Sequence, residues 1–142
     1  MAKLSARLAA VVDALPLRPG LRVLEIGGAP GAAARAVARR IGHGHILVID
    51  RSATGITHIR RNAADEIAAG RLSVRQVAAE DFELLTGEEP FDLAFAVRVG
   101  ALDGRHPRAG VLAIRRIAEA LTPAGRLFVD GGDPLREIDL AR

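Results

Sequence analysis

Hydrophobic and polar residues follow two kinds of pattern along this chain. Short apolar runs bounded by turn residues predict strands at residues 21–26, 45–50, 72–77, 91–97 and 126–130. Apolar stripes with helical spacing predict helices at residues 3–15, 31–41, 53–69 and 108–121. We also expect a short helix or turn at residues 79–85 and a turn at residues 122–125. Because strands and helices alternate, we expect an α/β fold, with a parallel sheet and right-handed helical crossovers.

The two ends of the chain fit a single domain over residues 1–142. Residues 1–20 hold the first helix and its Pro and Gly terminators, and residues 131–142 form a polar tail. Arg7 and Asp13 interrupt the apolar section near the N-terminus, which argues against a signal peptide. No run reaches the roughly 20 apolar residues of a membrane span. We therefore expect a cytoplasmic protein without a membrane partner.

The stretch from Leu21 to Arg35 organises the rest of the chain. A buried strand leads into the small-residue turn Gly27–Gly31, and a helix starts directly after it. Small residues let a ligand approach the backbone of such a turn, and the helix N-terminus adds positive potential. Glu25, near the end of the strand, either binds a cationic group, organises water and the turn, or only accepts hydrogen bonds from turn amides.

Asp50 ends the second strand, at the same edge of the predicted sheet as the turn. Ligands of open parallel sheets bind at the carboxyl ends of the strands, where the strand order switches. A carboxylate there can accept both hydroxyls of a ribose, although Asp50 could also simply cap the turn that contains Ser52.

A glycine-rich turn with a downstream acid also suits a nicotinamide-dependent oxidoreductase. Two features disfavour that alternative. The spacing is Gly27-x-Ala29-x-Gly31, not G-x-G-x-x-G, and Glu25 stands where a dinucleotide fold usually has an apolar residue.

The segment LEIGGAPG resembles the first motif of class I S-adenosylmethionine-dependent methyltransferases, an acidic residue, any residue, then G-x-G-x-G. Glu25, Gly27 and Gly31 match it, and Ala29 replaces the middle glycine, which leaves less room for the ligand. Further matches follow in the family's order at Asp50, Ala79–Asp81, Phe91–Leu93 and Leu121–Leu127. The resemblance covers nearly the whole chain and implies a Rossmann-like, doubly wound sheet of strand order 3-2-1-4-5.

The resemblance also implies a cofactor, S-adenosyl-L-methionine, with S-adenosyl-L-homocysteine as product. Its implied binding residues are Glu25, Gly27, Gly28, Ala29, Gly31, Asp50, Arg51, Ala79, Glu80, Asp81, Val97 and Arg98. The turn would hold the methionine and ribose, Asp50 the ribose hydroxyls, and the backbone at residues 97–98 the methionine ammonium. Arg51 would lie beside the adenine, and one of residues 79–81 would meet its edge.

Methyl transfer needs alignment more than a catalytic group, because the sulfonium is already activated. A base is needed only where the acceptor loses a proton. The candidates are Asp103, Arg105 and His106 in the loop after the fourth strand, and for each the simpler alternative is an ordinary polar loop residue.

The amino-acid composition limits the cofactors and binding partners that we expect. The sequence has no cysteine, which excludes a thiolate nucleophile, and its four histidines lack metal-ligand spacing, so we expect no metal. Nineteen of the twenty basic residues are arginine, yet the formal net charge is only +3 and the aromatic content 3%. The arginines are spread over several helices and no aromatic platform is present, which disfavours nucleic acid as a partner. A small-molecule acceptor is the remaining expectation.

Family members usually continue past the fifth strand into a helix and an antiparallel hairpin. Residues 131–142 are too few for that, so we expect five strands without the hairpin. The fifth strand, with Leu127–Val129 at its centre, would then be an exposed apolar edge. Either the tail covers that edge or a second subunit does, which predicts a possible homodimer.

These observations favour an S-adenosylmethionine-dependent methyltransferase with a small-molecule acceptor. The alternative is a non-catalytic S-adenosylmethionine-binding module, or one that depends on a partner, with an incomplete substrate half.

Overall fold

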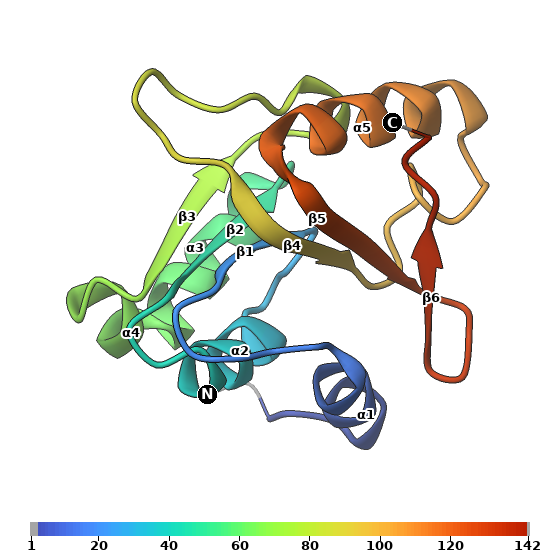
Figure 1. Cartoon of the computed structure of the whole chain (residues 1–142). Coiled ribbons are helices and arrows are strands. Elements are labelled where there is room, and N and C mark those ends of the chain that lie inside the picture. The colour runs from blue at the N-terminus through green and yellow to red at the C-terminus, as the bar shows by residue number, and fades with distance from the viewer. Residues whose placement is uncertain (1–2, 142) are drawn as a thin grey trace.

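A twisted sheet with helices on both faces forms the protein (Figure 1). The computed structural model describes residues 3–141. Its helices are α1 (Ala6–Ala14), α2 (Ala32–Arg40), α3 (Ala53–Asn62), α4 (Ala64–Ala68), the 3₁₀ turn η1 (Ala79–Asp81) and α5 (Pro107–Ala120). Its strands are β1 (Arg22–Ile26), β2 (His45–Asp50), β3 (Leu72–Gln76), β4 (Phe91–Ala96), β5 (Leu121–Asp130) and β6 (Leu135–Ile138).

The strand order is β3-β2-β1-β4-β5-β6, and β1 to β5 all run parallel. The predicted α/β class and the order 3-2-1-4-5 are therefore confirmed. Because β1 pairs with both β2 and β4, the chain leaves the sheet in opposite directions on either side of β1. This switch point is where open parallel sheets bind ligands.

The C-terminal residues do not form the tail that the sequence predicts. Residues 135–138 form β6, which pairs antiparallel with β5 from Leu127–Ile138 to Asp130–Leu135. The prediction of five strands without a hairpin was therefore wrong. The unpaired amides and carbonyls of an edge strand favour any partner within reach, and the segment after Asp130 is long enough to fold back. Since β6 fills that edge, the homodimer through β5 loses its structural premise.

Three further boundaries differ from the predicted ones. The helix expected over residues 53–69 is interrupted at Ala63, whose ψ of 24° breaks regular helix geometry between α3 and α4. The short helix or turn expected at residues 79–85 is the single 3₁₀ turn η1, which ends at Asp81. The turn expected at residues 122–125 lies inside β5, where the register with β4 shifts between Phe91 and Leu93.

The sheet separates two hydrophobic clusters. Alternate residues of β1 point to opposite faces, so Val23 packs with α1, α2 and α3 while Leu24 packs with η1 and α5. The same alternation turns Glu25 toward the face that α1 and α2 cover. The Glu25 side chain therefore lies between the sheet and α2.

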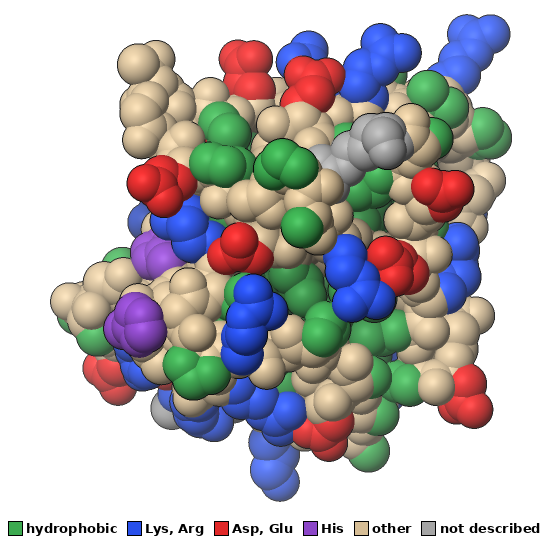
Figure 2. All heavy atoms as spheres, in the orientation of Figure 1, with side chains coloured by type: hydrophobic (Ala, Val, Ile, Leu, Met, Phe, Trp, Pro, Cys, Tyr) green, Lys and Arg blue, Asp and Glu red, His purple; other side chains and the backbone are tan. Residues whose placement is uncertain are grey.

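The surface mixes charges of both signs. On the face shown in Figure 2, Lys and Arg side chains lie scattered, with Asp and Glu side chains between them. Within residues 3–141, no helix is both long and apolar enough to cross a lipid bilayer.

Candidate functional site

Two adjoining cavities lie at the carboxyl ends of the central strands. The strand-end cavity, of about 510 Å³, is lined by the ends of β1 and β2, the segments after β3 and β4, and the start of α5. The turn cavity, of about 580 Å³, lies between the turn after β1, α1 and α2. Gly27 and Arg98 line both, so the two cavities together have the extent of a small-molecule site.

Most of the residues that the sequence singles out reach these cavities. The strand-end cavity is lined by Gly27, Asp50, Arg51, Ala79, Glu80, Arg98, Arg105 and His106. The turn cavity is lined by Glu25, Gly27, Gly28, Ala29, Val97 and Arg98. Parallel pairing explains the convergence, because it brings the loops after β1, β2, β3 and β4 to one edge of the sheet.

Two glycines in the turn are required sterically. A Cβ on Gly27, whose φ is +69°, would lie 2.8 Å from Val99 Cγ2. A Cβ on Gly28 would collide with Val48 and lie 2.7 Å from Glu25 Cδ. The backbone of this turn therefore packs directly on β2 and on the Glu25 carboxyl, and no larger residue fits at position 28.

Glu25 is an unusual buried acid. Its side chain is only 4% exposed, and among the described residues its Oε1 finds no hydrogen-bond partner. Burial, and to a smaller extent the negative charge of Asp50, raise the pKa of Glu25 to about 8. The alternative that Glu25 only accepts hydrogen bonds from turn amides does not hold for Oε1, which accepts none from the described residues. A buried acceptor without a partner fits a cationic ligand group better.

Asp50 links the second strand to the turn. Its Oδ1 accepts a hydrogen bond from the Ser52 amide at 2.9 Å, and its Oδ2 accepts one from the Ala29 amide at 3.2 Å. The capping role with Ser52 is therefore present. Because a carboxylate has about four acceptor positions, two remain for a ligand that lies in the strand-end cavity.

Three predicted residues lie outside the described lining of both cavities. Gly31, with φ +106°, is the N-cap of α2 and packs beside Ile59, so its role is in the backbone. Asp81 is exposed at the end of η1, whereas Glu80 lines the strand-end cavity, which favours Glu80 over Asp81. Asp103 is paired with Arg105, at 2.7 Å between Oδ2 and Nε.

The sequence reasoning missed the wall that α1 provides. Ser5, Arg7 and Leu8 line the turn cavity, although they are distant from the turn in sequence. Asp130, at the end of β5, accepts hydrogen bonds from the Arg98 amide at 3.1 Å and from Arg7 Nη2 at 2.6 Å. Asp130 could have been found as Asp50 was, because both are acids that end a parallel strand.

The apolar part of the strand-end cavity also escaped prediction. Ile26, Ile49 and Val77 line it at the ends of β1, β2 and β3. In sequence they look like ordinary core residues, and Ile26 and Ile49 are indeed buried; only their position at the strand ends makes them part of the cavity wall. Within residues 3–141, no cluster of His, Cys, Asp and Glu has the geometry to hold a metal ion.

Comparison with known proteins places this site in a family. Residues 23–125 match the methyltransferase domain, which is more than half of the chain. The chain belongs to the methyltransferase domain family. The matched segment runs from β1 into β5 and includes the turn, Asp50 and the loop before α5. The resemblance to class I S-adenosylmethionine-dependent methyltransferases is thereby confirmed.

Individual relatives agree with this assignment. The ubiquinone/menaquinone biosynthesis C-methyltransferase UbiE of Ruegeria sp. (strain TM1040) is 29% identical over 84% of this chain and 46% of its own length. A methyltransferase of Thiobacillus denitrificans, solved with S-adenosyl-L-homocysteine, superposes with a TM-score of 0.67 and 25% identity over 87% of this chain and 46% of that one.

A second similar structure has a different activity. The [4+2]-cyclase SpnF superposes with a TM-score of 0.69 and 27% identity over 86% of this chain and 42% of that one. The chain thus spans about half the length of the proteins it matches. The cyclase shows that this fold is compatible with reactions other than methyl transfer.

Proposed function

We propose that this domain binds S-adenosyl-L-methionine across the two cavities and transfers its methyl group to a small-molecule acceptor. The observation that carries the proposal is the arrangement of two acids around one glycine turn. Glu25 lies beneath Gly28, and Asp50 accepts a hydrogen bond from Ala29. Both acids border cavities that meet at Gly27.

The cavities fit the two halves of this cofactor. The unpartnered Oε1 of Glu25 suits the amino group of the methionine part, which would lie in the turn cavity near Val97 and Arg98. The free acceptor positions of Asp50 suit the ribose hydroxyls. The apolar walls at Ile49 and Val77, with Ala79 and Glu80 beside them, suit the adenine.

The bound cofactor supplies an activated methyl group, and the chain supplies position. The turn and Asp50 fix one reactant, and the loop at residues 98–106 lies where the second would enter. Proximity of this kind lowers the barrier without a covalent step by the protein. His106 lines the cavity and is the candidate proton acceptor. Asp103 is a weaker one, because its hydrogen bond from Arg105 lowers the pKa of this exposed carboxyl.

Calorimetric titration with S-adenosyl-L-methionine, S-adenosyl-L-homocysteine and NAD tests the cofactor. We expect micromolar binding of the first two and none of NAD. Tight NAD binding, or no binding of the first two, would refute the proposal.

A second candidate is a cofactor-binding module that performs no methyl transfer. The similarity to a [4+2]-cyclase supports it. The two alternatives differ in product: incubation with a panel of acceptors yields S-adenosyl-L-homocysteine only if methyl transfer takes place. Cofactor binding without product from any acceptor would favour the module.

A further inference from the structure

The loop between β4 and α5 brings two nitrogen-bearing side chains close to Gly100. Gly100 has no side chain, and the position that its Cβ would take lies 3.4 Å from both Arg105 Nη2 and His106 Nε2. The two nitrogens are therefore within about 7 Å of each other, and the His106 ring packs close to Gly100, with Cδ2 3.0 Å from the same point. All three residues line the strand-end cavity.

Arg105 is held in this position by its neighbour. Asp103 accepts hydrogen bonds from the Arg105 amide at 3.1 Å and from its Nε at 2.7 Å. These bonds leave the two terminal guanidinium nitrogens for another acceptor, since a guanidinium presents five donors in a fixed fork. Asp103 therefore orients the guanidinium and is a positioning residue.

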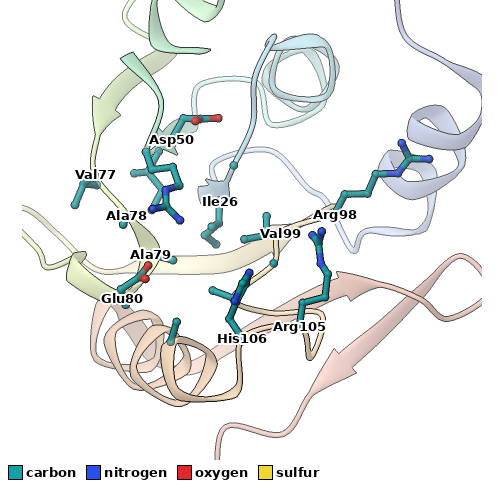
Figure 3. Close-up of a pocket in the computed structure, with 16 residues that line it drawn as sticks. Ile26, Asp50, Val77, Ala78, Ala79, Glu80, Arg98, Val99, Arg105 and His106 are labelled. Carbon is teal, nitrogen blue, oxygen red and sulfur yellow. The ribbon is translucent and has the colours of Figure 1, made fainter. Parts of the chain in front are cut away.

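Charged side chains of both signs line the cavity (Figure 3). Asp50 and Glu80 lie on one side, while Arg105 and His106 come from the opposite side and point toward Ile26 and Val99. Arg98 points away from them. Because Arg51 also lines the cavity next to Asp50, that side carries charges of both signs, whereas the described lining on the Arg105 side has no carboxylate.

We propose that Arg105, beside Gly100 and His106, binds an anionic group of the methyl acceptor, a carboxylate or a phosphate. The inference rests on the proposed function, because it assigns the Asp50 side to the cofactor and leaves the Arg105 side for the acceptor. A planar carboxylate or a phosphate oxygen pair matches the guanidinium fork. The positive end of α5, which begins at Pro107, adds potential of the same sign.

The test uses two probes of equal shape and different charge, benzoate and benzamide. Each is titrated into the ¹⁵N-labelled protein, in buffer of low ionic strength, with and without saturating S-adenosyl-L-homocysteine. At 15.0 kDa the chain suits two-dimensional NMR, and the amides of Gly100, Arg105 and His106 report the location. The variants are Arg105→Gln, Gly100→Ala and, as a control, Arg39→Gln, since Arg39 is exposed at the end of α2.

We expect benzoate to bind at least roughly tenfold more tightly than benzamide, as one charge-assisted hydrogen-bonded pair implies. Arg105→Gln should abolish the preference. Gly100→Ala should weaken benzoate binding, because its methyl group would lie 3.0 Å from His106 Cδ2 and 3.4 Å from Arg105 Nη2, so that both side chains would have to move. Arg39→Gln should behave as the wild type.

Three results would overturn the inference. Equal binding of both probes would show that the site does not recognise negative charge. Chemical-shift changes away from residues 100–106 would place the anion elsewhere. Loss of benzoate binding on addition of S-adenosyl-L-homocysteine would assign the site to the cofactor's own carboxylate. Failure of S-adenosyl-L-homocysteine to bind, with the benzoate preference intact, would instead refute the proposed cofactor and leave the anion site standing.

Discussion

Replacement of Glu25 by Gln should make the protein more stable at neutral pH. Burial and the nearby Asp50 charge raise the pKa of Glu25 from 4.5 to about 8 in the folded state. Between these values the folded protein keeps a proton that the unfolded chain has lost, so the free energy of unfolding falls as pH rises. A neutral amide of the same shape removes this penalty.

The magnitude follows from the shift. Each pH unit inside this window changes the free energy of unfolding by about 1.4 kcal/mol at 25 °C. From pH 5.5 to pH 7.5 the wild type should therefore lose about 2.5 kcal/mol relative to Glu25→Gln. Well below pH 4.5, Glu25 is protonated in both the folded and the unfolded state, so this residue no longer makes the free energy of unfolding depend on pH.

Urea denaturation at several pH values, without cofactor, measures the difference. Glu119→Gln is the matched control, because Glu119 is an exposed acid on α5. The reasoning is refuted if the difference between wild type and Glu25→Gln stays constant from pH 5.5 to pH 7.5. It is also refuted if Glu119→Gln shows the same pH dependence.

Three further predictions concern the cavities. Asp50→Ala should weaken S-adenosyl-L-homocysteine binding at least tenfold in calorimetry, since a hydrogen bond to a charged group contributes about 1.5–3 kcal/mol; Asp81→Ala is the control, and a change within twofold for Asp50→Ala contradicts the ribose role. Gly28→Ala should lower the free energy of unfolding by roughly 1–3 kcal/mol, because the new methyl group overlaps Val48 and Glu25; an unchanged urea midpoint would show that the turn has room. Asp130→Ala should weaken cofactor binding more than Arg7→Gln does, because only the first change also frees the loop after β4; equal effects would reduce Asp130 to its ion pair.

The proposed function also gives a reason for a destabilising buried acid at this site. A carboxyl without a partner costs free energy in the cofactor-free protein. The same group becomes favourable when a cationic amino group lies beside it, since an opposite charge lowers its pKa again. Under the proposed function, part of the folding free energy lost at Glu25 returns as binding free energy.

Much of the fold was available from the sequence, because the signals are local. Short apolar runs and helical stripes predicted five strands and their order relative to the helices, and the structure confirms the order. The turn at residues 27–31 and the acid at Asp50 were likewise readable, since each stands directly after a strand. Parallel topology then requires both to lie at one edge of the sheet.

The remaining features depend on contacts between distant segments. Residues 135–138 carry only two apolar side chains, so β6 is defined by the unpaired edge of β5 and not by its own pattern. The choice of Glu80 over Asp81 depends on which side chain η1 turns into the cavity. The convergence of Arg105 and His106 on Gly100 depends on one loop conformation. Local sequence thus determined the elements and the motif, whereas packing decided which polar groups meet and which stay without a partner.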